Sequence, residues 1–408
     1  MKLKIENVAK VSKAEINING ITLITGYNGS GKSTICKCLY KMLDCYSDLN
    51  SKILNEKKNS MSFVLSRWVD KMNEDINESY IKFFDIGDVF LDKLQEKNLK
   101  LDMLTKEILQ EILQEPELDF SPSPEELDDL YQDIKEVIDT PNYVYAEFII
   151  ETDFKNAFGS QINPLYNEKT AFMELDYSDI VNTMEFERNS LKDCTLFQLD
   201  IKTPVYLDAD NYFESMLRGR MRATERVNRI NRLVQMTNKK VILEEYNQLK
   251  SNKEIVENII KDVTHGDLVD TQGGLVFNEN GKEINCKNIA SGLKLFLLIQ
   301  RMLENGTLNA NSILIIDEPE VNLHPEWQVK LAEILVMIYV KLGIKIVLCT
   351  HSPYFMRAIE VNMANQEKAE YGKYYFMQTD DGSMYHAMDV TGRTEIVYET
   401  MYQPLENL

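Results

Sequence analysis

A glycine-rich turn between an apolar strand and a helix constrains the fold of this chain more than any other segment. The turn reads Gly26-Tyr-Asn-Gly-Ser-Gly-Lys-Ser33 and follows the largely apolar run Ile21–Thr25. Beyond it, apolar residues recur at spacings of three and four, which predicts a helix over about residues 32–43. The pattern GxxxxGK[ST] binds phosphate in this strand–turn–helix context, whereas the alternative is a chance glycine-rich helix start. The sequence therefore predicts an α/β fold with a phosphate-binding loop.

The residues of this loop predict a site for ATP and Mg²⁺. Glycines allow backbone N–H groups to turn toward the phosphates, and the start of the helix adds its positive dipole end. We expect Lys32 to neutralise the β- and γ-phosphates and the Ser33 hydroxyl to bind Mg²⁺. The expected nucleotide-binding residues of the loop are Gly26, Asn28, Gly29, Ser30, Gly31, Lys32, Ser33 and Thr34.

A second motif, Ile313-Leu-Ile-Ile-Asp317-Glu318-Pro319-Glu320, supplies acidic side chains. Its four apolar residues predict a central strand, and open α/β sheets bind ligands at the carboxyl ends of their strands. We expect Asp317 to serve the metal and Glu318 to activate the attacking water as a general base. An apolar strand that ends in acidic residues is common by itself, so this interpretation depends on the phosphate loop.

A further apolar strand, Lys345–Thr350, would deliver His351 to the same edge of the sheet. Of the four histidines, His351 alone follows an apolar strand directly, and we expect it to contact the γ-phosphate and the attacking water. The alternative is a structural histidine. A helix predicted over residues 325–342 joins this strand to the preceding one, which indicates a parallel sheet covered on both faces.

A weaker signal lies at the start of the helix predicted over residues 291–304. Ser291, Gly292 and Lys294 would form a second phosphate site at a helix N-terminus. A nucleotide already enclosed by the first loop has little access to this helix, so the site suits the nucleotide of a neighbouring molecule. Ser-Gly is also a common helix cap, which is the purely structural alternative.

In this order, the four motifs resemble those of the ATP-binding-cassette (ABC) ATPases, and especially the branch of SMC proteins, coiled-coil DNA-break-repair ATPases and OLD-type ATPases. The runs Asp317-Glu-Pro-Glu-Val-Asn322-Leu-His324-Pro325 and Thr350-His-Ser-Pro353 are most similar to the OLD-type group. That group includes ATPase subunits of bacterial anti-phage systems such as Septu, Gabija and PARIS. The resemblance covers about residues 1–45 and 280–360.

The resemblance implies an ABC-ATPase head, which is a P-loop NTPase with a mixed sheet flanked by helices. It also implies that two copies dimerise head-to-tail around two ATP molecules. Ser291 and Gly292 would then complete the partner's site, and residues 322–325 would cross between the two sites.

Two features depart from the family pattern. The signature reads Ala-Ser-Gly-Leu-Lys instead of the transporter-type Leu-Ser-Gly-Gly-Gln, which leaves the details of the contact between subunits open. No glutamine-loop motif is evident either. Gln161 is the candidate for this metal-site residue because it follows a predicted helix and precedes returning strands. Gln198 is its rival, and an ordinary surface glutamine is the third alternative.

The segments between the motifs predict a large helical insertion in the head. We assign residues 1–45 and 265–408 to the head, together with strands between 165 and 210. Residues 46–160 are expected to form an acidic helical insertion, in which a Ser-Pro-rich loop at 115–124 joins two helices. Residues 211–264 are expected to be an arginine-rich helical segment. Proline and glycine interrupt these regions too often for an SMC-length coiled coil.

Charge is unevenly distributed along a chain of net charge −20. Residues 101–140 hold 13 acidic residues against two lysines, and residues 216–240 hold eight basic residues against one glutamate. One predicted helix face carries Arg218, Arg222, Arg226 and Arg229. This face would meet a nucleic-acid backbone or an acidic partner. Alternatively, it is a solvated amphipathic helix or pairs with the chain's own acidic segment.

Several classes of protein are disfavoured. No apolar run approaches the roughly 18–20 residues that a membrane helix needs, and the N-terminus resembles a strand rather than a signal peptide. Six cysteines without a CxxC pair favour reduced thiols over a metal site. We therefore expect a cytoplasmic protein with no membrane partner.

These features predict an ATPase that acts as a homodimer or a higher, even-numbered oligomer. No toprim-type or HNH nuclease signature is present, so a nuclease or toxin effector would be a separate polypeptide. The favoured function is regulation or scaffolding of such an effector in anti-phage defence. The alternative is a DNA-repair or recombination ATPase that clamps DNA directly. The signature and the insertion disfavour a transporter ATPase.

Overall fold

The computed structural model describes residues 1–73, 86–97, 99–115, 118, 120–201, 204–208, 243–271 and 274–406. The chain forms two compact units, one of Met1–Ser47 with Phe154–Leu408 and one of Asp48–Asp153. We call them the head and the insertion. Arg218, Arg222, Arg226 and Arg229 lie outside the described residues.

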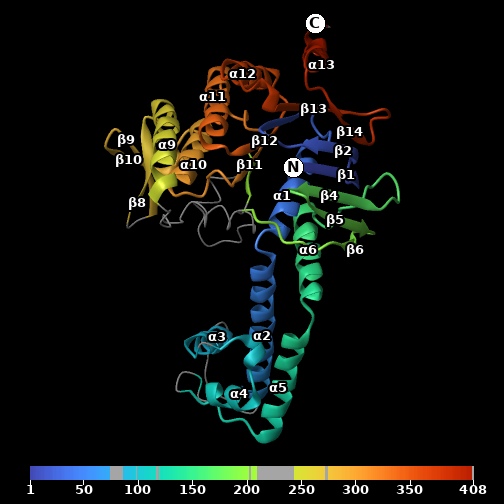
Figure 1. Ribbon diagram of the computed structural model, residues 1–408, viewed down its shortest axis with the longest axis vertical. Helices are drawn as coiled ribbons and strands as arrows, with labels where there is room; N and C mark the ends of the chain where they lie inside the picture. Colours follow the sequence, from blue (N-terminus) through green and yellow to red (C-terminus); the bar gives the residue numbers. More distant parts are fainter. Residues whose placement is uncertain are drawn as a thin grey trace. The chain divides into compact units, whose positions relative to one another are not determined.

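The head is built on a mixed sheet. Its eleven described strands follow the order β6-β5-β4-β1-β2-β14-β13-β3-β12-β11-β7 (Figure 1). Their bounds are β1 Lys2–Val8, β2 Val11–Asn17, β3 Ile21–Thr25, β4 Ala171–Tyr177, β5 Ile180–Glu187, β6 Ser190–Cys194, β7 Val205–Asp208, β11 Ile313–Asp317, β12 Lys345–Thr350, β13 Gly372–Gln378 and β14 Tyr385–Asp389. The strands β13, β3, β12, β11 and β7 run parallel, whereas β4, β5 and β6 pair antiparallel. The predicted α/β class with a mixed sheet is confirmed.

Helices cover both faces of the parallel strands, which explains why β3 and β11 are buried at every position. Leu23, Leu314 and Leu348 share one core with α9 to α12, while α1 packs against β11 and β12. The described helices of the head are α1 Lys32–Tyr46, α9 Leu243–Thr264, α10 Ser291–Glu304, α11 Pro325–Leu342, α12 Pro353–Asn365 and α13 Glu395–Glu406, with short 3-10 turns η2 Cys286–Asn288 and η3 Ala369–Tyr371.

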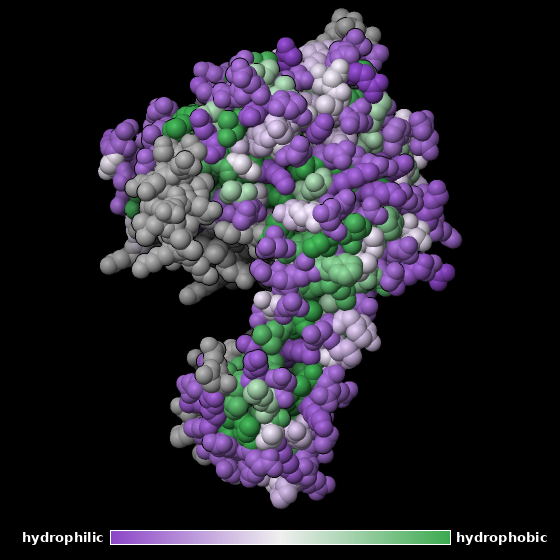
Figure 2. All heavy atoms as spheres, in the orientation of Figure 1, coloured by the Kyte–Doolittle hydropathy of each residue, from purple (hydrophilic) through white to green (hydrophobic). Residues whose placement is uncertain are grey.

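A separate three-stranded antiparallel sheet has the order β10-β9-β8. Its strands are β8 Gly266–Thr271, β9 Gly274–Glu279 and β10 Lys282–Asn285. The strands β9 and β10 form a hairpin before α10, and β13 and β14 form a second antiparallel hairpin in the main sheet. On the face of the molecule shown in Figure 2, hydrophilic residues cover most of the head, in keeping with apolar residues gathered in its interior.

The insertion is helical. It contains α2 Leu49–Asn73, α3 Ile86–Glu96, η1 Leu101–Met103, α4 Lys106–Leu113, α5 Pro124–Asp139 and most of α6 Asn142–Phe158. The predicted Ser-Pro-rich loop joins α4 to α5, and Ser123 and Glu126 form a capping box that starts α5 behind Pro124. Met61, Leu65 and Leu130 belong to a core that is distinct from the core of the head. None of the described helices is long and apolar enough to cross a membrane.

The separate cores predict that the insertion can be destabilised locally. Leu130 is only 1% exposed, so Leu130→Ala should lower the free energy of unfolding of the insertion by about 2–5 kcal/mol through lost burial and a residual cavity. Hydrogen exchange read by mass spectrometry should accelerate in α2, α4 and α5 and stay unchanged in β11 and β12. Leu54→Ala, at a position that is 45% exposed, is the matched control. Equal acceleration in both units would contradict the separation.

Candidate active site

The phosphate loop follows β3 and leads into α1, and its geometry requires glycine at two positions. Gly26 has a φ of 149° and Gly31 a φ of 91°. A side chain at Gly31 would meet Val11 Cγ2 at 2.8 Å, and one at Gly26 would meet Met377 Cβ at 2.9 Å. The loop therefore fits between neighbouring strands only with glycine at both positions, and residues 27–29 are exposed on its outer side.

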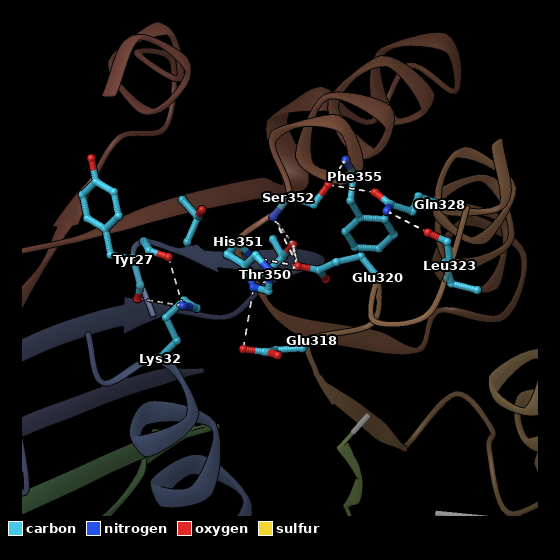
Figure 3. A network of polar contacts seen from close by, with 12 residues as sticks. Tyr27, Lys32, Glu318, Glu320, Leu323, Gln328, Thr350, His351, Ser352 and Phe355 are labelled. Carbon is cyan, nitrogen blue, oxygen red and sulfur yellow. Dashed lines mark hydrogen bonds and ion pairs between the residues drawn. The ribbon is translucent and has the colours of Figure 1, made fainter. Parts of the chain in front are cut away.

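Lys32 is 4% exposed, and its ammonium lies inside the loop. Its Nζ donates hydrogen bonds to the carbonyl oxygens of Gly26 at 2.9 Å and Tyr27 at 3.0 Å (Figure 3). A second cation, which the sequence motifs did not indicate, lies nearby. The Nζ of Lys10, in the β1–β2 turn, is 4.0 Å from the position that a Cβ on Gly29 would take. The backbone of the loop therefore lies close to two lysine ammonium groups, one from α1 and one from the β1–β2 turn.

Asp317 ends β11 and is 6% exposed. Its Oδ2 accepts a hydrogen bond from the Tyr206 hydroxyl at 3.0 Å, and its Oδ1 has no hydrogen-bond partner in the described part of the chain. Burial raises the pKa of Asp317 above its usual value, while the hydroxyls of Ser33 and Tyr206 act in the opposite direction. Ser33 and Asp317, two of the three residues expected at the metal, are therefore neighbours.

The donor set fits Mg²⁺. Within the described ranges, no group of three or more His, Cys, Asp or Glu side chains could hold a metal ion. Mg²⁺ is commonly held by one or two protein oxygens, with phosphates and water as its other ligands. The Asp317 carboxyl group, whose Oδ1 has no partner among the described residues, and the neighbouring Ser33 hydroxyl suit that mode of binding.

Asp208 is a site residue that the motifs missed. It ends β7, and its register places it opposite Asp317 on the adjacent parallel strand. Its negative charge adds to the upward shift in the pKa of Asp317. The signal that could have found it is the run Val205-Tyr-Leu-Asp208, a short apolar strand that ends in an acidic residue as β11 does.

Glu318 and His351 meet at the carboxyl ends of β11 and β12. Glu318 adopts a left-handed φ of 54°, and its backbone N–H donates to the carbonyl of Cys349 at 2.8 Å. This turn directs its side chain toward His351, whose Nδ1 lies 3.6 Å from Glu318 Oε1 and 3.5 Å from Glu320 Oε1 (Figure 3). The side chains of Glu318 and His351 are 36% and 39% exposed, so both are accessible to a ligand.

The signature motif packs on the segment that follows Glu318. Ser291 is exposed at the start of α10, and Gly292 is in close contact with the next turn. A Cβ on Gly292 would lie 3.0 Å from the carbonyl oxygen of Asn322 and 3.0 Å from Leu323 Cδ2. Glycine at this position therefore allows α10 to approach residues 322–323 closely. Lys294 lies one turn further along α10.

Neither Gln161 nor Gln198 lies at the strand end next to Asp317. That position is occupied by Asp208. Gln161 is exposed in the loop after α6, and the carbonyl of its neighbour Ile162 accepts a hydrogen bond from the Ala9 N–H at 2.8 Å. That loop therefore adjoins the β1–β2 turn that carries Lys10. Gln198 is exposed in the segment between β6 and β7. The metal role of Gln161 stays a prediction.

Two cysteines lie behind the phosphate loop. The sulfur atoms of Cys36, on α1, and Cys349, on β12, are 2.6 Å apart, and Cys349 also donates to the carbonyl of Lys32 at 3.3 Å. All six cysteines are free thiols, and burial raises the pKa of both Cys36 and Cys349. These protonated thiols pack the core directly beneath Lys32.

The contact between Tyr206 and Asp317 predicts a shift in the Mg²⁺ requirement. Tyr206→Phe removes the hydrogen bond that helps to keep the buried Asp317 carboxyl ionised, so the pKa of Asp317 should rise further. We expect the Mg²⁺ concentration for half-maximal ATP hydrolysis to rise about 10- to 100-fold at neutral pH, since one such bond is worth roughly 1.5–3 kcal/mol. The increase should shrink as the pH is raised. Tyr374→Phe, in the core of the head, is the control, and an unchanged Mg²⁺ titration for Tyr206→Phe would contradict the assignment.

Solved structures of SMC heads are among those similar to this chain. Solved structures similar in fold include an SMC head bound to the C-winged helix domain of ScpA, with a TM-score of 0.48, 11% identity and coverage of 97% of this chain and 98% of that chain. Another is the SMC head domain from Thermotoga maritima, with a TM-score of 0.40, 11% identity and coverage of 95% and 98%. A third is an Smc head with an extended coiled coil bound to the C-terminal domain of ScpA derived from Pyrococcus furiosus, with a TM-score of 0.43, 10% identity and coverage of 98% of both chains.

No curated protein matches the chain. Residues 1–356, which include the phosphate loop, the acidic strand end and His351, match the family described as the AAA ATPase domain. The chain therefore belongs to the AAA ATPase domain family, and it is an ATPase.

Proposed function

We propose that this ATPase binds Mg-ATP between two copies of the chain and that hydrolysis releases the dimer. The observation that carries the proposal is the position of the signature motif. Ser291 is exposed, and Gly292 is fixed against Asn322 and Leu323, only a few residues beyond Glu318. A helix N-terminus presented outward in this way is an anion-binding group available to the nucleotide of a second molecule.

Within each site, we assign the chemistry to residues from three strand ends. Lys32 would hold the phosphates, and Ser33 and Asp317 would hold Mg²⁺, which when bound would neutralise phosphate charge. Glu318 accepts a proton as water attacks the γ-phosphorus and the bond to the ADP oxygen breaks. His351 contacts the γ-phosphate. The separation of 3.6 Å between His351 Nδ1 and Glu318 Oε1 supports a shared role at the attacking water.

Substitution of Glu318, the proposed base, distinguishes ATP binding from ATP hydrolysis. Glu318→Gln should lower kcat about 100-fold or more, since general-base catalysis contributes roughly that factor, while ATP binding persists. The ATP-bound dimer should then accumulate, which light scattering coupled to size-exclusion chromatography can measure. Equal loss of ATP affinity and turnover would rule out Glu318 as the base.

Mixing two inactive variants tests whether the site is shared between subunits. Lys32→Ala should abolish phosphate binding, and Ser291→Arg should block the partner's nucleotide from an exposed position. Each variant alone should be inactive. A mixture should regain ATPase activity, because the mixed dimer contains one site with an intact Lys32 and an intact Ser291 from different subunits. An inactive mixture of variants that form mixed dimers would contradict the shared site.

We further propose that the ATP-driven switch regulates or scaffolds a separate nuclease or toxin in bacterial anti-phage defence. The motif Asp317-Glu-Pro-Glu with Asn322-Leu-His-Pro325, which is similar to that of OLD-type ATPases, supports this role. A small nuclease or toxin gene beside this one, and loss of phage protection in Glu318→Gln, would support it. Protection that persists in the inactive variant would argue against the switch.

Direct clamping of DNA in repair or recombination is the second candidate. The one-face spacing of Arg218, Arg222, Arg226 and Arg229 favours it, although these residues lie outside the described structure. DNA affinity that falls steeply with salt, and that disappears in an Arg218/Arg222/Arg226 triple alanine variant, would favour this candidate.

A further inference from the structure

Glu320 is a buried carboxylate that binds the turn carrying His351. It is 6% exposed. Its Oε1 accepts three hydrogen bonds from three consecutive residues, namely from Thr350 Oγ1 at 2.7 Å, His351 N at 2.8 Å and Ser352 N at 3.2 Å (Figure 3). A single carboxylate oxygen, just beyond the end of β11, therefore holds the three residues at the end of β12.

The same carboxylate also faces the imidazole. His351 Nδ1 lies 3.5 Å from Glu320 Oε1 and 3.6 Å from Glu318 Oε1. Nδ1 is buried and has no hydrogen-bond partner among the described residues. Ionised carboxylates only accept hydrogen bonds, so a proton on Nδ1 would face two acceptors. Nε2, on the opposite side of the ring, is then the atom left to contact a phosphate or the attacking water.

The network continues to the segment that supports the signature motif. Ser352 Oγ donates to Gln328 Oε1 at 2.7 Å, and Gln328 Nε2 donates to the carbonyl of Leu323 at 3.2 Å. Leu323 in turn contacts Gly292, and its own N–H donates to the carbonyl of Glu320 at 3.0 Å. Glu320 is therefore bonded both to the His351 turn and to the segment on which α10 rests.

The hydrogen bonds to the His351 turn do not by themselves explain why residue 320 carries a charge. Burial of a carboxylate is costly unless its oxygens are hydrogen-bonded, and Oε2 of Glu320 is buried with no hydrogen-bond partner among the described residues. A glutamine would offer the same Oε1 acceptor to all three donors without the charge. The ionised group therefore serves the imidazole rather than the turn.

We propose that Glu320 is a positioning residue for hydrolysis. Its three hydrogen bonds fix the backbone of His351, and its charge holds the Nδ1–H form of the ring facing Glu318. Through Ser352 and Gln328, the position of His351 depends on the residue 322–323 segment beneath the signature helix. This inference rests on the proposed roles of Glu318 and His351.

The test compares Glu320→Gln with the unmodified protein in three measurements. Because the amide keeps the acceptor and removes a buried charge, we expect that the thermal unfolding midpoint does not fall and that the KM for ATP stays unchanged, while kcat falls about 10- to 100-fold. Nitrogen-15 NMR of labelled histidine should show His351 losing the Nδ1–H form, and His351→Ala assigns its signal among the four histidines. Glu333→Gln, on the exposed side of α11, should change none of these values.

A double variant tests whether Glu320 acts through His351. If it does, adding Glu320→Gln to His351→Ala should leave kcat no lower than in His351→Ala alone. An unchanged kcat in Glu320→Gln, an unchanged histidine spectrum, or a further loss in the double variant would overturn the proposal. Thr350→Val removes only one of the three donors, and it should lower kcat severalfold even if Glu320→Gln folds poorly.

The result for Glu320 can be distinguished from a failure of the proposed function. Full activity in Glu318→Gln would refute the assignment of the base, whatever Glu320 does. Slow turnover in Glu318→Gln together with normal turnover in Glu320→Gln would refute only the positioning role.

Discussion

The parallel pairing of β3, β12, β11 and β7 is the constraint on which the rest of the structure depends. In this register Thr25 lies opposite Thr350, and Asp317 lies between Cys349 and Asp208. The four strands therefore end together, so the residues that follow them meet at one edge. A slip of one residue would turn every side chain to the other face of the sheet and would separate Asp317 from Ser33.

The charged side chains at this edge are only partly compensated by hydrogen bonds within the protein. Lys32, Asp317 and Glu320 are all nearly buried, and each is only partly compensated. Two loop carbonyls bind Lys32, while one oxygen of Asp317 and one of Glu320 have no hydrogen-bond partner in the described part of the chain. Such groups cost stability in the folded protein. A Mg²⁺ ion bound beside Asp317 would offset part of that cost, so the same arrangement that weakens the fold strengthens binding of the metal nucleotide.

Local sequence predicted the elements of the site better than the contacts between them. The phosphate loop, β11 and β12 carry their apolar and glycine patterns within a few residues, so their type and bounds were accessible, as was the meeting of Glu318 with His351 at one edge. The pairing of Asp208 with Asp317 was missed because the two residues lie more than 100 positions apart in the sequence. Lys10 and the donors to Glu320 were missed for the same reason. Each is brought to its partner by strand pairing and not by closeness in the sequence. The strand β6, Ser-Leu-Lys-Asp-Cys, has no apolar alternation to mark it.

The connection between the phosphate loop and the insertion is a single helix, and its far end is anchored in the head. Helix α1 begins at Lys32 and ends at Tyr46, whose buried hydroxyl donates to the carbonyl of Thr183 at 3.2 Å. The carbonyl of Tyr46 also accepts a hydrogen bond from Leu199 N–H at 3.0 Å. A helix that is tied to β5 and to the segment before β7 at its exit resists movement there, even if its first turn adjusts to nucleotide. This anchoring holds the last turn of α1 in place within the head.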